Sequence, residues 1–221
     1  DDAWQPNVEE LAERITPQTR GIVIINPNNP TGAVYSQEAL LAVIELARRH
    51  GLVLLADEIY DKLSYGEQPH ISLASLADDV PVITFGGLSK PYLAPGWRIG
   101  WGIVSGPPVI APYVEGISKL LRSRLCATQP MQFAIKPALE GPQDHLETVR
   151  AKLQSRCAVT MRWCEQTPRV SCVMPQAAFY AFPKLDIPED DFTFVKAVLT
   201  ETQVLLVHGS GFGEKSGSRH V

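Results

Sequence analysis

The sequence predicts an α/β fold, in which a mainly parallel sheet carries helices on both faces. Two observations lead to this class. The runs GIVII at 21–25 and LVLLADE at 52–58 are short, continuous and apolar, which is typical of strands buried on both faces. A helical pattern lies between them. The order strand, helix, strand indicates a right-handed parallel crossover unit.

The segment between these two strands has helix signals at both ends. Ser36 is a typical N-cap residue, and the following QEALLAVIELARRH repeats apolar residues three and four positions apart. Arg48 and Arg49 stand in the last turn, and Gly51 comes directly after it. We therefore expect a helix over 37–50.

Further strands and helices follow along the chain. PVITFGG at 81–87 predicts a third strand of the same kind, and RIGWGIV at 98–104 predicts a fourth. The later elements mix helices and short strands: helices near 109–127, 131–139 and 144–165, strands around VSCVM, AAFYAFP and VLLVH, and a helix near FTFVKAVLTE. Because Gly141-Pro142 marks a break, we expect a large domain over 1–142 and a smaller α+β domain over 143–221.

The composition is that of a soluble globular protein. Hydrophobic residues make up 45% of the 221, and the net charge of -4 offers no basic stripe for nucleic acid. No apolar run could span a membrane, and the polar start has no signal-peptide pattern, although a fragment could have lost its targeting segment. The four cysteines form no CxxC pair and the five histidines lack metal-ligand spacing. We expect a cytoplasmic protein with reduced thiols, no metal, and no nucleic-acid or membrane partner.

Three polar residues follow the ends of the first three predicted strands. Asn29 comes after the first strand, Asp57 ends the second, and Lys90 lies just past the third. In open α/β sheets, ligands bind outside the carboxyl ends of parallel strands. These three side chains are therefore expected to converge on one ligand.

The residues around these positions carry a family resemblance. NPNNPTG, ADEIYD and GLSKPYLAPGWRIGW, in that order, resemble the signature of the fold-type-I aminotransferases that use pyridoxal 5'-phosphate (PLP). IYDKLSYG and SRLCATQP resemble the alanine aminotransferase-like branch. The resemblance covers essentially the whole chain. It implies part of a PLP-transferase large domain with a small domain after it, in a homodimer that moves an amino group between L-alanine and a 2-oxo acid such as 2-oxoglutarate.

The resemblance implies a role for each of five residues. Lys90 matches the lysine that forms a Schiff base with the cofactor and then moves a proton in catalysis. Asp57 matches the carboxylate that faces the pyridine nitrogen, and Tyr60 the tyrosine that hydrogen-bonds the phenolic oxygen. Asn29 matches the asparagine that reaches that oxygen and the substrate carboxylate, and Arg98 the arginine that clamps the phosphate. Taken alone, these residues could also be a solvated lysine, a strand-end aspartate, a turn asparagine and a structural arginine.

The chain departs from the family pattern in one position and is expected to be incomplete. Many members place a serine three residues before the lysine, where this chain has Gly87. Family members are about twice as long, so the phosphate turn, a stacking aromatic ring and a tyrosine from the partner subunit are expected upstream. The arginine for the substrate carboxylate is expected directly after Val221, with Arg219 exposed on the turn before it. We therefore expect little or no activity from this chain alone.

Three other functions share part of this sequence pattern. LVLLADE resembles a Walker B strand, but its P-loop candidate GSGFGEKS at 209–216 lies on the wrong side of it and has a glutamate before the lysine. Some transcription regulators carry an aminotransferase-like PLP domain as a sensor, with a helix-turn-helix module upstream. A PLP-dependent C–S lyase or synthase on the same fold would keep all five residues.

Overall fold

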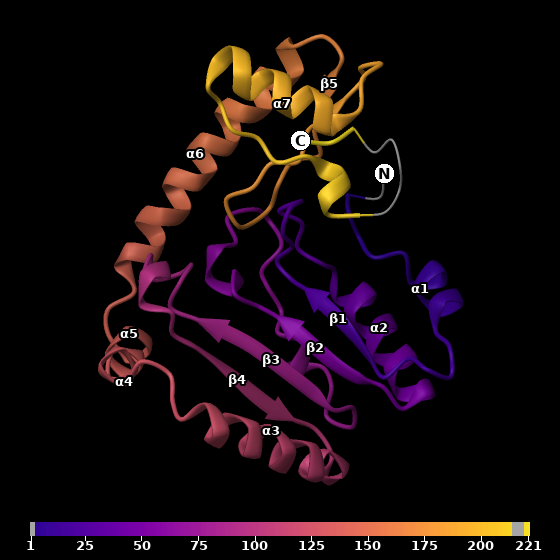
Figure 1. The fold of residues 1–221 in the computed structure, drawn as a ribbon, viewed down its shortest axis with the longest axis vertical. Coiled ribbons are helices and arrows are strands. Elements are labelled where there is room, and N and C mark those ends of the chain that lie inside the picture. Colours follow the sequence, from indigo (N-terminus) through magenta and orange to yellow (C-terminus); the bar gives the residue numbers. More distant parts are fainter. Residues whose placement is uncertain (1–2, 214–218) are drawn as a thin grey trace.

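The computed structural model describes residues 3–213 and 219–221, and a four-stranded sheet forms its lower half in Figure 1. The strands stand in the order β1-β2-β3-β4. Their bounds are Gly21–Ile25, Val53–Asp57, Val82–Gly87 and Gly100–Ser105. The first three strands are parallel and β4 is antiparallel to β3. The predicted α/β class and all four predicted strands are confirmed.

Helix α2 (Gln37–His50) covers one face of this sheet and begins and ends where the sequence predicts. Ser36 Oγ accepts a hydrogen bond from Ala39 N at 3.1 Å, and Gly51 adopts the left-handed conformation that a side chain disfavours (φ 62°). The buried face of α2 and the sheet residues beneath it form the main core, to which α1 (Val8–Arg14) adds partly buried residues. Core members include Leu40, Val43, Ile44, Ala47, Ile22, Ile24, Leu54, Ala56 and Val82.

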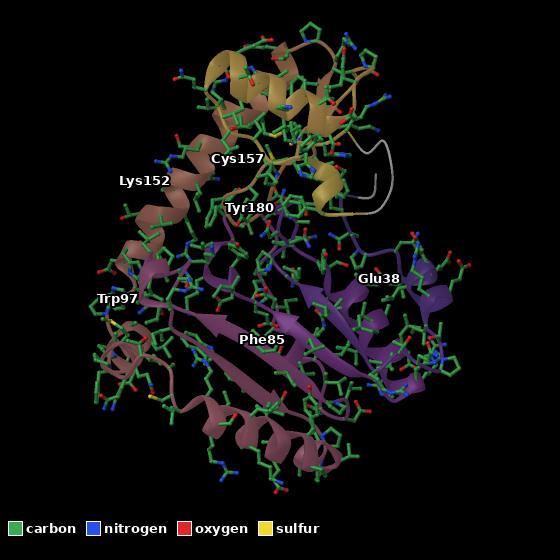
Figure 2. All side chains as sticks on the ribbon, viewed as in Figure 1. Glu38, Phe85, Trp97, Lys152, Cys157 and Tyr180 are labelled. Atoms are coloured by element: carbon green, nitrogen blue, oxygen red, sulfur yellow. The ribbon has the colours of Figure 1, made fainter. Side chains whose placement is uncertain are left out.

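The opposite face of the sheet is open among the described residues. Val23 is 64% exposed and Phe85 is 41% exposed, and Phe85 is labelled on the sheet in Figure 2. Helix α3 (Ala111–Arg124) runs beside β4 in Figure 1 and has no buried residue. The apolar side chains of this face and of α3 therefore meet solvent in this chain.

A long helix joins the sheet to an upper lobe, which contains the upper part of α6 together with β5, β6 and α7 (Figure 1). The predicted break at Gly141 separates this helix from the short ones before it. The bounds are α4 Gln129–Gln132, α5 Ile135–Glu140, α6 Asp144–Gln166, β5 Val170–Ser171, β6 Lys184–Leu185 and α7 Asp191–Thr202. The predicted helices near 144–165 and 192–201 are confirmed, whereas the one near 131–139 is divided between α4 and α5.

Two predicted strands of the upper lobe are wrong. AAFYAFP at 177–183 is not a strand, because Ala178 has φ 60° and this left-handed residue interrupts the extended backbone. VLLVH at 204–208 is irregular, since no described segment pairs with it. Arg219 was expected to be exposed but is half-buried, because its carbonyl accepts a hydrogen bond from Leu185 N at 2.8 Å. The P-loop candidate at 209–216 lies partly outside the described residues.

No helix in the described ranges is long and apolar enough to cross a membrane. Within the same ranges, no three histidine, cysteine, aspartate or glutamate side chains gather as a metal site. Cys126, Cys157, Cys164 and Cys172 are free thiols.

Candidate active site

The carboxyl ends of the three parallel strands lie on the side of the sheet that faces the upper lobe (Figure 1). Asp57 is the last residue of β2 and pairs in register with Ile25 of β1 and Phe85 of β3. The chain continues from β1 to Asn29 and from β3 to Lys90. The fold therefore brings the three predicted strand-end positions to one edge of the sheet.

Asp57 is half-buried, and within the described ranges its side chain accepts one hydrogen bond, from Ile59 N to Oδ1 at 3.3 Å. No lysine, arginine or histidine of the described ranges forms an ion pair with it. A partly desolvated carboxylate without a cationic partner is costly unless a ligand supplies the partner. Asp57 can therefore receive a cationic or hydrogen-bonding group at the sheet edge.

Tyr60 lies directly before the 3-10 turn η1 (Asp61–Leu63) and is 3% exposed. Its hydroxyl group hydrogen-bonds the hydroxyl of Tyr180, with 2.6 Å between the two oxygens. Burial raises the pKa of Tyr60 above its usual value, and the charge of Asp57 raises it further. The Tyr60 phenol therefore stays protonated at neutral pH and can donate a hydrogen bond.

The Lys90 ammonium group stands between two aromatic rings. Its Nζ lies 5.8 Å from the ring centre of Tyr60 and 5.5 Å from that of Phe179. Within the part of the chain that the structure describes, Nζ forms neither a hydrogen bond nor an ion pair. The backbone around it is fixed, because Leu93 N donates to the Lys90 carbonyl at 3.3 Å and Leu88 N donates to Ile99 O at 3.1 Å. Lys90 is thus a held amine without an acceptor.

Asn29 differs from the other two asparagines of its loop. The side chain of Asn26 accepts from Tyr35 N at 2.9 Å, and that of Asn28 accepts from Thr31 Oγ1 at 2.8 Å. These two amides stabilise the loop itself. The Asn29 amide forms no such bond in the described ranges, and Asn29 lines a cavity of about 520 Å³ whose other lining residues, apart from Pro30, belong to the upper lobe. Lys90, Asp57 and Tyr60 do not line this cavity. Asn29 is therefore the asparagine available to a ligand.

Arg98 stands apart from the other predicted residues. It is exposed, it has φ 56° after the turn η3 (Pro95–Trp97), and its Nη1 donates to the Pro95 carbonyl at 2.8 Å. No hydrogen bond or ion pair joins Arg98 to Lys90 or Asp57 in the described ranges.

The glycine at position 87, where many family members have serine, has a steric explanation. A Cβ atom at Gly87 would lie 2.9 Å from Ile99 O, so two backbone segments pass closely there.

Two residues of this site were missed by the sequence prediction. The rings of Phe179 and Tyr180 both contact Tyr60, with centroid distances of 5.5 Å and 5.6 Å. The same two residues line the cavity with Asn29. Figure 2 places Tyr180 between the sheet and the upper lobe. Their only signal in the sequence is the aromatic content of AAFYAFP, and strand alternation would have put them on opposite faces.

The chain is similar to several known proteins over almost all of its length. The chain is 46% identical over 216 residues to glutamate-pyruvate aminotransferase AlaA of Escherichia coli K12, covering 95% of this chain and 53% of that protein. It is 46% identical over 217 residues to the alanine aminotransferase of Mycobacterium tuberculosis H37Rv, covering 95% of this chain and 50% of that protein. The solved structure of the alanine aminotransferase of Pyrococcus furiosus matches with a TM-score of 0.94 and 40% identity, over 99% of this chain and 56% of that one.

The α/β fold and these matches place the chain among the aminotransferases. The model of the family "Aminotransferase class I and II" matches residues 1–219, so the chain belongs to this family. The chain spans about half the length of the curated relatives that it matches.

Proposed function

We propose that the protein of which this sequence forms a part is a PLP-dependent aminotransferase that moves an amino group between L-alanine and a 2-oxo acid such as 2-oxoglutarate. The observation that carries this proposal is the Lys90 amine, held beside the rings of Tyr60 and Phe179 without a hydrogen-bond acceptor in the described ranges. The names of the relatives, glutamate-pyruvate aminotransferase and alanine aminotransferase, support the choice of alanine.

The unpartnered polar groups of the site fit PLP. This cofactor needs an amine for its aldehyde, a carboxylate for its pyridine nitrogen and a donor for its phenolic oxygen. Lys90 Nζ, the Asp57 carboxylate and the Tyr60 hydroxyl have these chemistries, and the first two lack a charged partner in the described ranges. The Arg98 guanidinium would bind two phosphate oxygens, but its hydrogen bond to the Pro95 carbonyl would first have to break.

Each residue would then have a distinct part in catalysis. PLP, when bound, supplies an electron-withdrawing ring that lets the Cα proton of an amino acid leave. Lys90 Nζ would hold the cofactor covalently and, once substrate has replaced it, accept that proton and return it to a neighbouring carbon. Asp57 would stabilise the positive charge of the protonated pyridine ring. Asn29 would orient the substrate, and Tyr60 would donate a hydrogen bond to the phenolic oxygen.

We also propose that the whole protein is a homodimer in the cytoplasm. The family resemblance implies the homodimer, and the free thiols fit the reducing cytoplasm. The phosphate turn and the substrate arginine would come from sequence outside this chain. For this reason we expect the isolated chain to have little transaminase activity.

Trapping the cofactor on its lysine tests this proposal. Full-length protein loaded with PLP is reduced with borohydride, digested and mapped by mass spectrometry, and we expect the label on the Lys90 peptide. Lys90→Ala should lower the rate of pyruvate formation from alanine by about 10²–10⁴-fold. Lys62→Ala, in the turn after Tyr60, is the matched control and should keep most of the activity. Label on another lysine, or full activity in Lys90→Ala, would reject the proposal.

A further inference from the structure

Within the described ranges, the hydroxyl group of Tyr60 forms a hydrogen bond with the hydroxyl group of Tyr180. The two oxygens lie 2.6 Å apart, at the short end of the range for hydrogen bonds between hydroxyl groups. The two rings meet edge to face at 79°, and the Phe179 ring packs against both. Tyr60 is almost completely buried, so water does not readily replace this partner.

The backbone before Tyr180 is fixed to both loops of the site. Gly32, in the loop that carries Asn29, accepts hydrogen bonds at its carbonyl from Gln176 N at 2.9 Å and Ala177 N at 3.0 Å. Leu63, in the turn after Tyr60, accepts at its carbonyl from Ala178 N at 3.1 Å. The two tyrosines therefore meet because one short segment is attached to both loops.

We infer that Tyr180 is a positioning residue for this site: it donates a hydrogen bond to the Tyr60 oxygen and thereby directs the Tyr60 hydroxyl proton toward the cofactor. This inference rests on the proposed function. It assigns a role to a residue that the sequence did not predict as part of the site.

The direction of the hydrogen bond follows from counting protons. A phenol has one proton to donate and can accept at its oxygen. If the Tyr60 hydroxyl donates its one hydrogen bond to the phenolic oxygen of the cofactor, Tyr180 must be the donor in the hydrogen bond between the two tyrosines. A hydrogen bond accepted by Tyr60 also polarises its O–H group and makes it a stronger donor. Removing the Tyr180 hydroxyl should therefore weaken the hydrogen bond that Tyr60 makes to the cofactor.

The pH dependence of the visible absorption of the lysine-bound cofactor measures this effect. Tyr60 stabilises the deprotonated phenolic oxygen, so a weaker bond lets the proton remain to higher pH. We expect Tyr180→Phe in the full-length protein to raise the midpoint of this titration by about half to one pH unit, which is what the loss of one hydrogen bond corresponds to. The substitution keeps the ring and its packing, and thermal unfolding verifies that the variant is folded.

A double mutant separates positioning from a structural role. In a Tyr60→Phe background, Tyr180→Phe should produce no further change of the midpoint, because Tyr180 acts through Tyr60. Tyr65→Phe is the matched control: Tyr65 lines a cavity with Tyr180 but interacts with Cys157, and its midpoint should equal that of the wild type. An unchanged midpoint in Tyr180→Phe, or equal shifts with and without Tyr60, would refute the inference. If the wild-type protein showed no PLP-dependent visible band, the proposed function itself would fail.

Discussion

Asp57 is the residue whose surroundings most clearly leave a place for a ligand. It ends β2 at the edge where three parallel strands stop, and among the described residues only the Ile59 amide donates a hydrogen bond to its side chain. A buried carboxylate that served the fold alone would be expected to have a cationic partner or several donors. Its proposed partner is the pyridine nitrogen of the cofactor.

Replacement of Asp57 by asparagine tests this role. Asn keeps the size of the side chain but removes its charge, so PLP should still bind to Lys90 while loss of the Cα proton becomes slower. We expect a decrease on the order of 10²–10³-fold, similar to the removal of one electrostatic stabiliser. The measurement is exchange of the alanine Cα proton with deuterated solvent, followed by NMR on the full-length variant.

The neighbouring carboxylate Asp61 provides the control for this substitution. Its Oδ1 accepts from its own turn, at Lys62 N and 2.8 Å, so Asp61→Asn should leave the exchange rate close to that of the wild type. Equal exchange rates in Asp57→Asn and the wild-type protein would show that Asp57 does not support proton loss.

The candidate site could be predicted only in part from the sequence. Asn29, Asp57 and Lys90 were predictable because strand ends have a local sequence signal. Tyr180 lies 120 residues from Tyr60 along the chain, and its contact depends on the left-handed Ala178, which no pattern in the sequence indicates. The roles of all five predicted residues stay predictions, and Arg98 is exposed in the structure.

At the scale of elements, the loops after β1 and β2 are joined by a buried polar network. Glu58 directly follows Asp57, is 7% exposed, and accepts from Leu73 N at 2.8 Å and Ser72 Oγ at 3.2 Å. The His70 ring lies between Glu58 and Asn26, with its nitrogens 3.3 Å and 3.5 Å from their side chains. This network fixes the two loops that carry the proposed ligand-binding residues.

Glu58→Ala should therefore destabilise the part of the protein that contains the four-stranded sheet. The substitution leaves the Leu73 amide and the Ser72 hydroxyl without their buried acceptor, and each buried unsatisfied group costs about 1–3 kcal/mol. We expect a decrease of this size in the free energy of unfolding, measured by urea denaturation. Glu115→Ala is the control, because Glu115 is an exposed member of a helical ion pair with Lys119, and such pairs contribute at most about 1 kcal/mol. Equal effects of the two substitutions would contradict a structural role for the network.

The elements themselves followed from the sequence where their signals are local. The first strand and the Ser36-capped helix were predicted to the residue, and the second strand to within one residue at each end, because capping and apolar spacing act within a few positions. The strands predicted over 177–183 and 204–208 were wrong because a strand also requires a partner, which a local pattern does not supply. Sequence rules are thus weakest where pairing decides the structure.

At the scale of the whole molecule, the sheet has one covered face and one open face. Val23 lies on the open side of β1, and α3 also leaves apolar residues in solvent, such as Leu120 at 72% exposed. Contiguous exposed apolar surface usually marks an interface. Since the relatives have about twice the length of this chain, we expect the remainder of the full-length protein to cover this face.

Val23→Asp should therefore have different consequences in the chain alone and in the full-length protein. In the chain alone, Val23 is already 64% exposed, so the charge stays solvated and the free energy of unfolding should change by less than about 0.5 kcal/mol. In the full-length protein, the same charge would be buried without a partner and should cost about 3 kcal/mol or more. Leu41→Asp, on the outer side of α2, should have a small effect in both forms. A small effect of Val23→Asp in the full-length protein as well would mean that this face stays open.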